Sequence, residues 1–320
     1  MSASINWGNL LDALSRQSDF SSLFFNKANI TLEQRQEILK TFVLSLHAEA
    51  TGIVEGANYK SHRLLPDSIN TQKVLYKSVD AYRYILAILN LCNISGEQFV
   101  NALKQKDEFL HYRHKLSQKK WNGEPIVLFD MDDVLAEFRS SWCEYVTKDS
   151  GIFIDPNCSE YYNVTTFKKH GLSNEHYFRT FIDNHGFLGL HPNDRYCQTL
   201  RRLKEEGCWI QVITARPEHN LTCFYDTYSW LHRNNIPTDS IVFAPEKFAW
   251  VASQPFYSSG KFFAVDDSAK HAAEYAKHGV RVVVPQKSYN TEVATLQNIA
   301  YVSESNDPFE SAKIILESIR

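Results

Sequence analysis

The chain has 320 residues, of which 43% are hydrophobic and 13% aromatic, and this composition is sufficient for two domains with packed cores. Its formal net charge of −3 disfavours a nucleic-acid partner, because proteins that bind the phosphate backbone usually carry a strongly basic surface.

Targeting segments and paired cysteines are both missing from the sequence. Its first residues lack the basic and apolar stretches of a secretory signal, and no apolar run approaches the roughly 20 residues that span a bilayer. The six cysteines form no CxxC pair, which is typical of reduced thiols rather than of disulfides or a zinc site. We therefore expect a cytoplasmic protein without a membrane partner.

The first third of the chain carries apolar residues at helical spacing. Three helices are expected, with the sequences LEQRQEILKTFVLSLHAEATGIV, TQKVLYKSVDAYRYILAILNLC and SGEQFVNALKQKDEFLHYRHKL. Thr31 and Glu33 are start signals for the first helix, and Ser95 is the expected N-cap of the third. The polar run SQKKWNGEP (117–125) predicts a linker, so we expect an all-α domain over residues 1–120.

After residue 125 the pattern changes to short β-rich runs separated by helical segments. The expected strands are IVLFD (126–130), WIQVIT (209–214), SIVF (240–243), FFAVD (262–266) and VRVVV (280–284). The expected helices cover residues 194–206, 219–233 and 269–278. This alternation predicts a parallel sheet covered on both faces, in which functional groups gather beyond the carboxyl ends of the strands. We expect an α/β Rossmann-like domain over residues 121–320.

Two aspartates lie at the end of the first strand, two residues apart. Asp130 could attack phosphorus as a nucleophile, since an aspartate can carry a covalent phosphoryl group. Asp132 could protonate the leaving oxygen and then activate water as a general acid and base. A turn without catalytic meaning explains the spacing about equally well, because aspartate is favoured in turns.

The next two strands also end in groups suited to an anion. Thr214 and Ala215 offer a hydroxyl and free backbone N–H groups ahead of a helix, although Thr214 could simply cap that helix. Lys247 follows the third strand and could neutralise phosphate. Lys261, directly before the fourth strand, is its competitor.

The fourth strand ends in the acidic pair Asp266 and Asp267. Two adjacent carboxylates after an apolar strand are costly unless a cation balances them. Mg²⁺ prefers carboxylate and phosphate oxygens, so it is the cofactor that fits this pair best. Four such elements, each at a strand end, favour a phosphate-processing enzyme more strongly together than any one of them alone.

In this order the four elements resemble the haloacid dehalogenase superfamily of phosphohydrolases, and they match as DMDDV (130–134), ITARP (213–217), Lys247 and DD (266–267). The resemblance implies that Asp130 forms an aspartyl-phosphate and that Asp132 is the acid and base. It also implies phosphate binding by Thr214, Ala215 and Lys247. Magnesium would be held by Asp130, Asp132, Asp266 and Asp267, with Asp132 contributing its main-chain carbonyl.

Within that superfamily the chain is most similar to the cytosolic and mitochondrial type of 5′-deoxynucleotidase. The similar stretches are VLFDMDDVLAEF (127–138), GFLGLHP (186–192), VITARPE (212–218) and SIVFAPEK (240–247). This implies a helical cap at about residues 139–185 and a nucleoside or deoxynucleoside monophosphate as substrate. The aromatic residues of the cap interval could stack a nucleobase. For any single one of them, a place in the cap's own core is the more common explanation.

The N-terminal helices resemble the all-α nucleoside-triphosphate pyrophosphohydrolases of the MazG and dimeric dUTPase group. The similar stretches are HAEATGIVEGANYKSHR (47–63) and the run KSVDAYRYILAILNL followed by GEQFVNALKQKDEFLHYRHKL. Those enzymes hold magnesium with acidic pairs on neighbouring helices. Here Glu49 and Asp80 are present, but Gly52 and Lys77 stand where their acidic partners are expected. We interpret Glu49 and Asp80 as a vestigial site, although Glu55 could substitute in another register.

The sequence therefore predicts a Mg²⁺-dependent phosphomonoesterase that acts on a small nucleotide. Two other enzymatic hypotheses remain open: a bifunctional pyrophosphohydrolase and phosphatase, and a polynucleotide end phosphatase, which the negative charge disfavours. A non-catalytic nucleotide sensor is a further alternative, and the intact strand-end residues argue against it. Relatives of both halves often dimerise, so a homodimer is also considered.

Overall fold

The computed structural model describes residues 8, 12–13, 15–17, 30–56 and 69–320. The chain divides into two compact units, Met1–Lys106 and Asp107–Arg320, and the division falls within helix α4 (Gly96–Ser117). In the part of the chain that is described, no helix is both long and apolar enough to cross a membrane. All six cysteines are free thiols.

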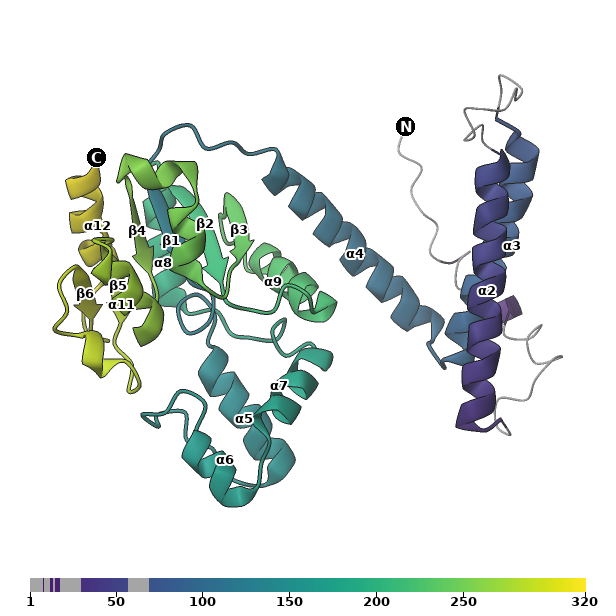
Figure 1. Ribbon diagram of the computed structural model, residues 1–320, viewed down its shortest axis with the longest axis horizontal. Helices are drawn as coiled ribbons and strands as arrows, with labels where there is room; N and C mark the ends of the chain where they lie inside the picture. The colour runs from purple at the N-terminus through teal and green to yellow at the C-terminus, as the bar shows by residue number, and fades with distance from the viewer. Residues whose placement is uncertain (1–7, 9–11, 14, 18–29, 57–68) are drawn as a thin grey trace. The chain divides into compact units, whose positions relative to one another are not determined.

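The first unit contains α2 (Leu32–Gly56) and α3 (Thr71–Leu91), which pack along each other (Figure 1). The predicted helices are confirmed here. Thr31 and Gln34 exchange hydrogen bonds between side chain and backbone N–H at the start of α2 (2.9 and 3.2 Å), and so form a capping box. Glu33, the other predicted start signal, lies in the first turn of α2. Ser95 caps α4 in the same way with Gln98.

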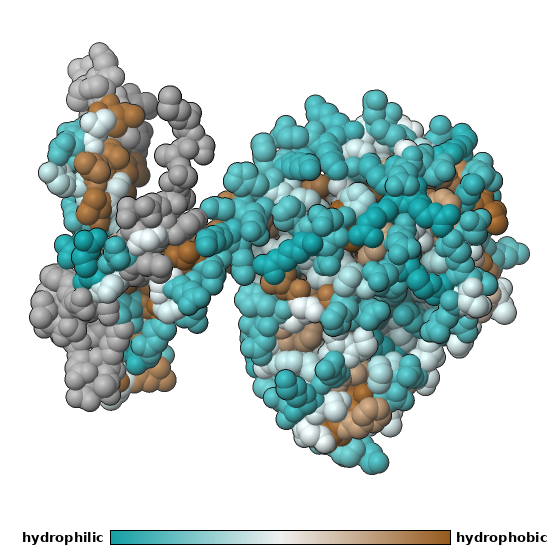
Figure 2. All heavy atoms as spheres, turned by 180° about the vertical axis from the view of Figure 1, so that it is seen from behind, coloured by the Kyte–Doolittle hydropathy of each residue, from teal (hydrophilic) through white to brown (hydrophobic). Residues whose placement is uncertain are grey.

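Both helices of this pair leave large apolar side chains exposed, including Leu44 and Leu75. Apolar patches are accordingly visible on the surface of these helices (brown in Figure 2), whereas the face of the second unit in the same view is mostly hydrophilic. Residues 57–63 of the stretch that resembles a pyrophosphohydrolase lie outside the described residues.

The second unit is built on a six-stranded parallel sheet with strand order β3-β2-β1-β4-β5-β6. The strands are β1 (Ile126–Phe129), β2 (Trp209–Thr214), β3 (Ser240–Phe243), β4 (Phe262–Val265), β5 (Val282–Pro285) and β6 (Ile299–Val302). Five of them were predicted, and β6 was not. Since the strand order reverses at β1, the carboxyl ends of β1, β2 and β4 lie beside a topological switch point, where open α/β sheets bind ligands.

Alternate residues of each strand point into two separate hydrophobic cores. Val127 and Phe129 face the core that contains α8 (Asp194–Glu205), α9 (Leu221–Arg233) and α12 (Pro308–Ile319). Ile126 and Leu128 face the core that contains α10 (Lys247–Ala252) and α11 (Ala269–Lys277). A parallel sheet buried on both faces requires such continuous apolar strands, so polar groups are left to the strand ends.

Between β1 and β2 the chain forms a helical cap with α5 (Phe138–Ser150), α6 (Val164–His170) and α7 (Asn174–Asp183). Its core is aromatic: Trp142, Phe167 and Phe181 are each at most 3% exposed and contact one another or their neighbours through ring edges and faces. Most large aromatics of this interval therefore form the cap's own core. Tyr161, Tyr162 and Phe178 line a cavity instead.

The second half of α4 belongs to the second unit. Phe109 is 2% exposed and packs edge-on against Tyr228 of α9, and Leu116 joins the same cluster. Lys119, in the expected linker, donates to the carbonyl of Thr238 (2.7 Å) and to a carboxylate oxygen of Asp239 (2.9 Å). The residues just before β1 are thus part of the folded unit.

A fragment of residues 107–320 should be more stable than one of residues 121–320. The shorter fragment loses the burial of Phe109 and Leu116, and removing one buried Phe side chain typically costs about 3–5 kcal/mol. Denaturant unfolding of both fragments measures the difference, and Phe109→Ala in the longer fragment should reproduce most of it. Equal stability of the two fragments would contradict this account of α4.

Gly186→Ala should destabilise the cap, whereas Gly189→Ala should not. A Cβ at Gly186 would lie 2.5 Å from the ring of Phe181, which packed neighbours hold in place, while at Gly189 the nearest atom would be 3.7 Å away. Overpacking of this kind costs about 1–3 kcal/mol. Thermal unfolding of the two variants provides a matched comparison, and a similar Tm for both would refute it.

Candidate active site

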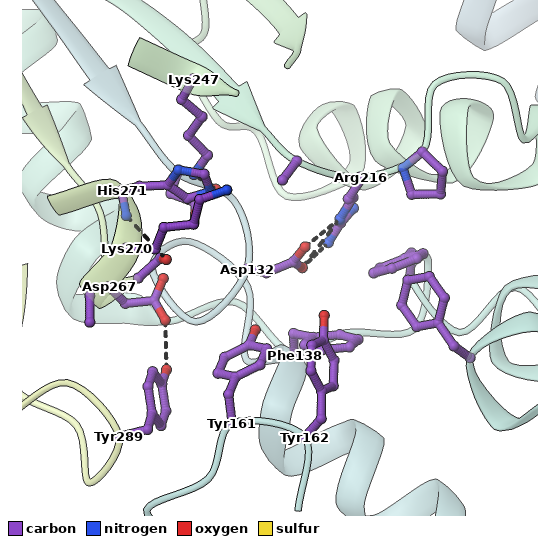
Figure 3. A pocket seen from close by; sticks show the side chains of 17 residues that line it. Asp132, Phe138, Tyr161, Tyr162, Arg216, Lys247, Asp267, Lys270, His271 and Tyr289 are labelled. Atoms are coloured by element: carbon purple, nitrogen blue, oxygen red, sulfur yellow. Dashed lines mark hydrogen bonds and ion pairs between the residues drawn. The ribbon is translucent and has the colours of Figure 1, made fainter. Parts of the chain in front are cut away.

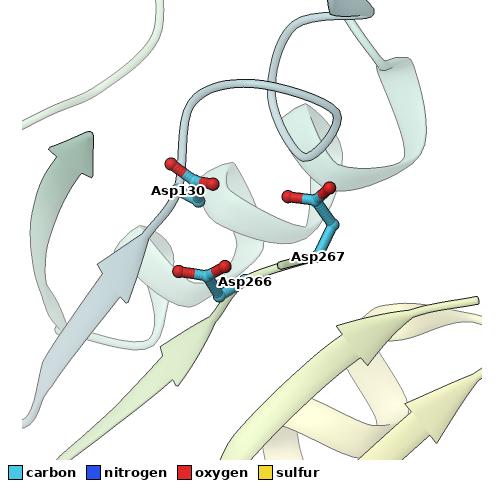
Figure 4. A group of neighbouring side chains, drawn as sticks. All are labelled: Asp130, Asp266 and Asp267. Atoms are coloured by element: carbon cyan, nitrogen blue, oxygen red, sulfur yellow. The ribbon is translucent and has the colours of Figure 1, made fainter. Parts of the chain in front are cut away.

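Three buried aspartates meet at the carboxyl edge of the sheet. Asp130 follows β1, and Asp266 and Asp267 follow the neighbouring β4 (Figure 4). Each offers a carboxylate oxygen within 4.8 Å of the others, and the three residues are 7%, 1% and 2% exposed. They form the one group of this kind among the described residues.

A tight turn after β1 places the next acidic residues. Asp133 has a φ of 57°, a left-handed conformation that aspartate tolerates better than most residues, and its N–H donates to the carbonyl of Ala136 (2.7 Å). The carbonyl of Met131 accepts the N–H groups of Leu135 (3.0 Å) and Ala136 (2.8 Å). The chain therefore turns sharply enough for Asp130 and Asp132 to line one cavity.

Lys247 joins two of the three aspartates. Its Nζ lies 2.7 Å from a carboxylate oxygen of Asp130 and 2.7 Å from one of Asp266, and its side chain is 1% exposed. These carboxylates raise the pKa of Lys247 against the effect of burial, so the lysine is charged. The competing Lys261 lies exposed at the start of β4.

The side chain of Asp132 is turned toward Arg216 and away from Asp267 (Figure 3). The Nε of Arg216 donates to Oδ2 of Asp132 at 2.9 Å, and its Nη2 donates to Oδ1 at 2.5 Å. This two-point contact is the geometry in which arginine binds a carboxylate most strongly.

Asp267 is held from the other side by the loop after β5. The hydroxyl of Tyr289 donates to its Oδ2 (2.6 Å), and the side-chain amide of Asn290 donates to its main-chain carbonyl (2.7 Å). Burial is the main cause that raises the pKa of Tyr289, and the nearby Asp267 raises it further, so the hydroxyl remains a donor.

A cavity of about 600 Å³ opens over these groups. One part of its wall is polar, and the other is formed by rings. The aromatic residues that line it are Phe138, Tyr161, Tyr162, Phe178, Phe187 and Tyr289. Lys270 and His271, at the start of α11, complete the polar wall (Figure 3). A cavity with charged groups at its base and rings around it suits a phosphate ester with a flat organic part.

The carboxylates at the base are short of positive charge. Burial raises the pKa of Asp130 to about 7, although Lys247 opposes the shift. Burial also raises the pKa of Asp267 well above its usual value, and Asp133, Asp130 and Asp266 add to the effect. Several carboxylate oxygens that converge without enough cations suit a hard divalent ion, so the residues present fit a divalent metal.

The predicted phosphate-binding residues after β2 differ in their access to the cavity. The side chain of Thr214 is fully buried and its Oγ1 accepts the N–H of Arg216 (3.2 Å), whereas Ala215 lines the cavity.

In the first unit, the predicted vestigial acid Glu49 forms an ion pair with Lys77 (2.8 Å). The aliphatic part of Lys77 fills the space that a Cβ on Gly52 would need.

Two residues with clear roles in this geometry received none from the sequence. Arg216 stood within the motif ITARP, and a buried strand that ends in a charged residue was the available signal. Tyr289 lies in a loop and gives no local signal, since only the fold brings it to Asp267.

Residues 124–307 match the protein family described as 5′ nucleotidase, deoxy (pyrimidine), cytosolic type C protein. This match covers more than half of the chain. The chain belongs to this family. Because the family consists of nucleotidases, the protein is a phosphomonoester hydrolase, and the acidic edge of the sheet is its candidate active site. Among curated proteins, none matches the nucleotidase significantly.

Three solved structures that are similar to this chain are distant from it in sequence. A protein described as a predicted phosphatase from Clostridium acetobutylicum is 17% identical, with a TM-score of 0.43 over 61% of this chain and 99% of its own. A haloacid dehalogenase-like family hydrolase from Streptococcus pneumoniae is 12% identical, with a TM-score of 0.43 over 60% and 98%. A HAD family hydrolase from Deinococcus radiodurans is 15% identical, with a TM-score of 0.41 over 61% and 96%.

The metal-free nucleotidase should lose stability as the pH rises from about 4 to about 7. The pKa of Asp130 is about 7 in the folded protein against an ordinary 3.8, so the folded state binds more protons than the unfolded state in this range. Carboxyls whose pKa is lowered by folding, such as Asp239, stabilise the fold across this whole range and lose that effect only at lower pH.

Thermal unfolding in chelator at pH 5 and pH 7 measures this effect. A divalent ion should raise the Tm more at pH 7, because at pH 5 it must displace protons. Asp267→Asn should remove most of the metal response. An equal gain at both pH values would contradict the assigned electrostatics.

Proposed function

We propose that this nucleotidase hydrolyses nucleoside or deoxynucleoside monophosphates in a Mg²⁺-dependent reaction through an aspartyl-phosphate on Asp130. The observation that carries the proposal is the contact of Lys247 with Asp130 and Asp266 at the base of the cavity, 2.7 Å to each. The contact brings together the proposed nucleophile Asp130, the positive charge of Lys247 and the proposed metal ligand Asp266, so that one phosphoryl group can reach all three.

The first half-reaction transfers the phosphoryl group to the enzyme. An oxygen of Asp130 forms a bond to phosphorus while the bond from phosphorus to the ester oxygen breaks, and Asp132 gives its proton to that oxygen. In the second half-reaction water attacks the same phosphorus, its proton passes to Asp132, and the Asp130 carboxylate is restored. Lys247 and the backbone at Thr214 and Ala215 bind the phosphoryl oxygens.

Magnesium would be held by the carboxylates of Asp130, Asp266 and Asp267 and by the main-chain carbonyl of Asp132. When bound, it supplies positive charge that offsets both the acidic cluster and the phosphate. Tyr289 and Asn290 orient Asp267, so the ligand group is already in place before substrate arrives.

A nucleotide suits the remainder of the cavity. Rings of the cavity wall that keep part of their surface exposed, such as Tyr161, Tyr162 and Phe178, can stack a base, a contact worth about 1–3 kcal/mol per base. The family's own description names deoxynucleotides and pyrimidines and the cytosol, which supports this substrate class and a cytoplasmic location.

We propose that the helical unit, which ends at Lys106 rather than at the expected residue 120, is an accessory domain without pyrophosphohydrolase activity. It is attached to a phosphatase unit of residues 107–320 whose cap covers about 139–185. The pairing of Glu49 with Lys77 supports this, because a lysine ammonium already compensates the acid that would bind metal. The exposed apolar side chains of α2 and α3 support a homodimer formed through this domain.

Asp130→Asn should lower phosphate release from nucleoside monophosphates by several orders of magnitude, because the attacking carboxylate is lost. The assay compares all nucleoside and deoxynucleoside monophosphates with magnesium, with EDTA and after magnesium is restored. Asp183→Asn, at an exposed aspartate of the same unit, is the matched control and should retain full activity. Activity above about a tenth of wild type in Asp130→Asn, or full activity in EDTA, would exclude this mechanism.

A further inference from the structure

Each of the three side-chain nitrogens of Arg216 donates a hydrogen bond to a neighbouring side chain. Arg216 is 3% exposed, and its guanidinium contacts the Asp132 carboxylate through Nε and Nη2, as described above. On the far side Nη1 donates to the hydroxyl of Thr227 (3.0 Å), which in turn donates to the carbonyl of Cys223 (2.8 Å). The ring of Phe187 lies 4.0 Å from the centre of the guanidinium.

These contacts fix the guanidinium before any substrate binds. Thr227 is anchored on α9, Phe187 belongs to the aromatic core beneath the cap, and the main chain of Arg216 is held by Thr214. The charge of a buried guanidinium must be compensated, and Asp132 is the carboxylate in direct contact with it. Asp226, the other buried acid nearby, is paired with His185 (2.9 Å).

We propose that Arg216 is the positioning residue for Asp132 in this nucleotidase, and the inference rests on the proposed function. The arginine fixes the direction of the carboxylate and stabilises the negative charge that Asp132 acquires when its proton passes to the ester oxygen. After that transfer the Arg216 guanidinium compensates the Asp132 carboxylate through the same two-point contact. In this state Asp132 is ready to take a proton from the water that hydrolyses the aspartyl-phosphate, and that proton serves the next turnover.

A positioning role predicts a loss that depends on the leaving group. Arg216→Met should lower kcat/KM for a nucleoside monophosphate by about 10- to 100-fold, since its sugar oxygen must be protonated and general acid catalysis is worth about 10²–10⁴. For 4-nitrophenyl phosphate, whose nitrophenolate departs without a proton, kcat/KM should change by less than about threefold. Equal losses on both substrates would overturn the proposal.

The double variant Asp132→Asn/Arg216→Met tests whether Arg216 acts through Asp132. Its kcat/KM for the nucleotide should equal that of Asp132→Asn alone, because there is no carboxylate left to position. Arg139→Met is the matched control, since Arg139 is equally buried but its guanidinium contacts the carbonyls of Cys158 and Glu160. The fold-loss in kcat/KM caused by Arg139→Met should multiply with the fold-loss caused by Asp132→Asn. If the fold-losses of Arg216→Met and Asp132→Asn also multiplied, the proposal would be overturned.

Two milder variants keep the test valid if Arg216→Met fails to fold. Arg216→Lys keeps the charge without the two-point contact and should show the same dependence on the leaving group. Thr227→Val removes the hydroxyl that accepts from Nη1 and donates to the carbonyl of Cys223, while Arg216 keeps its contact with Asp132. The loss in kcat/KM should be smaller than for Arg216→Met, and it should vanish in the Asp132→Asn background. Retained activity in Asp130→Asn would refute the proposed function itself, whereas multiplied losses with an inactive Asp130→Asn would refute only the role of Arg216.

Discussion

The Lys247 ammonium at the base of the site connects three elements that are distant in sequence. Lys247 is the first residue of α10, the helix that follows β3, and its two carboxylate partners follow β1 and β4. A buried charge without a partner costs several kcal/mol, so the lysine and the two aspartates stabilise the fold only as a set. None of these three charges can be buried without its partners, so the ends of β1, β3 and β4 must lie side by side. Site geometry and core packing depend on each other at this point.

The single lysine does not balance the set, and this shortage determines what the site can bind. Of the three aspartates, only Asp130 and Asp266 contact the Lys247 ammonium, and burial raises the pKa of Asp130 and Asp267. The excess of carboxylate oxygens attracts a cation, while the apolar strands beneath prevent water from dispersing the charge. An anionic ester alone would be repelled by such a cluster. The same electrostatic cost that weakens the metal-free fold thus favours a metal together with a phosphate.

Sequence patterns predicted the elements whose signal is local. The apolar runs of β1 to β5 were predicted from the sequence. The polar residues that follow them, such as Asp130 after β1 and Lys247 at the start of α10, were noticed because a buried parallel strand leaves polar groups only at its ends. The short edge strand β6, in which three residues are half-buried and Val302 is buried, was not predicted. Arg216 and Tyr289 were missed as well. Their contacts with Asp132 and Asp267 join segments far apart in the chain, and no local periodicity reports them.

The two aspartates of the first turn lie beside different cations, and this difference supports the different roles proposed for them. Asp130 faces Lys247 and the other carboxylates, in surroundings that gather charge around a phosphoryl group. Asp132 faces Arg216, whose guanidinium is fixed by Thr227 and Phe187. Two carboxyl groups with the same side chain can act as nucleophile and as acid only if their environments differ. In this protein the difference comes from β2 and α9 on one side and from β4 and α10 on the other. The carboxyl ends of the strands therefore give the two aspartates different surroundings, as the proposed division of roles requires.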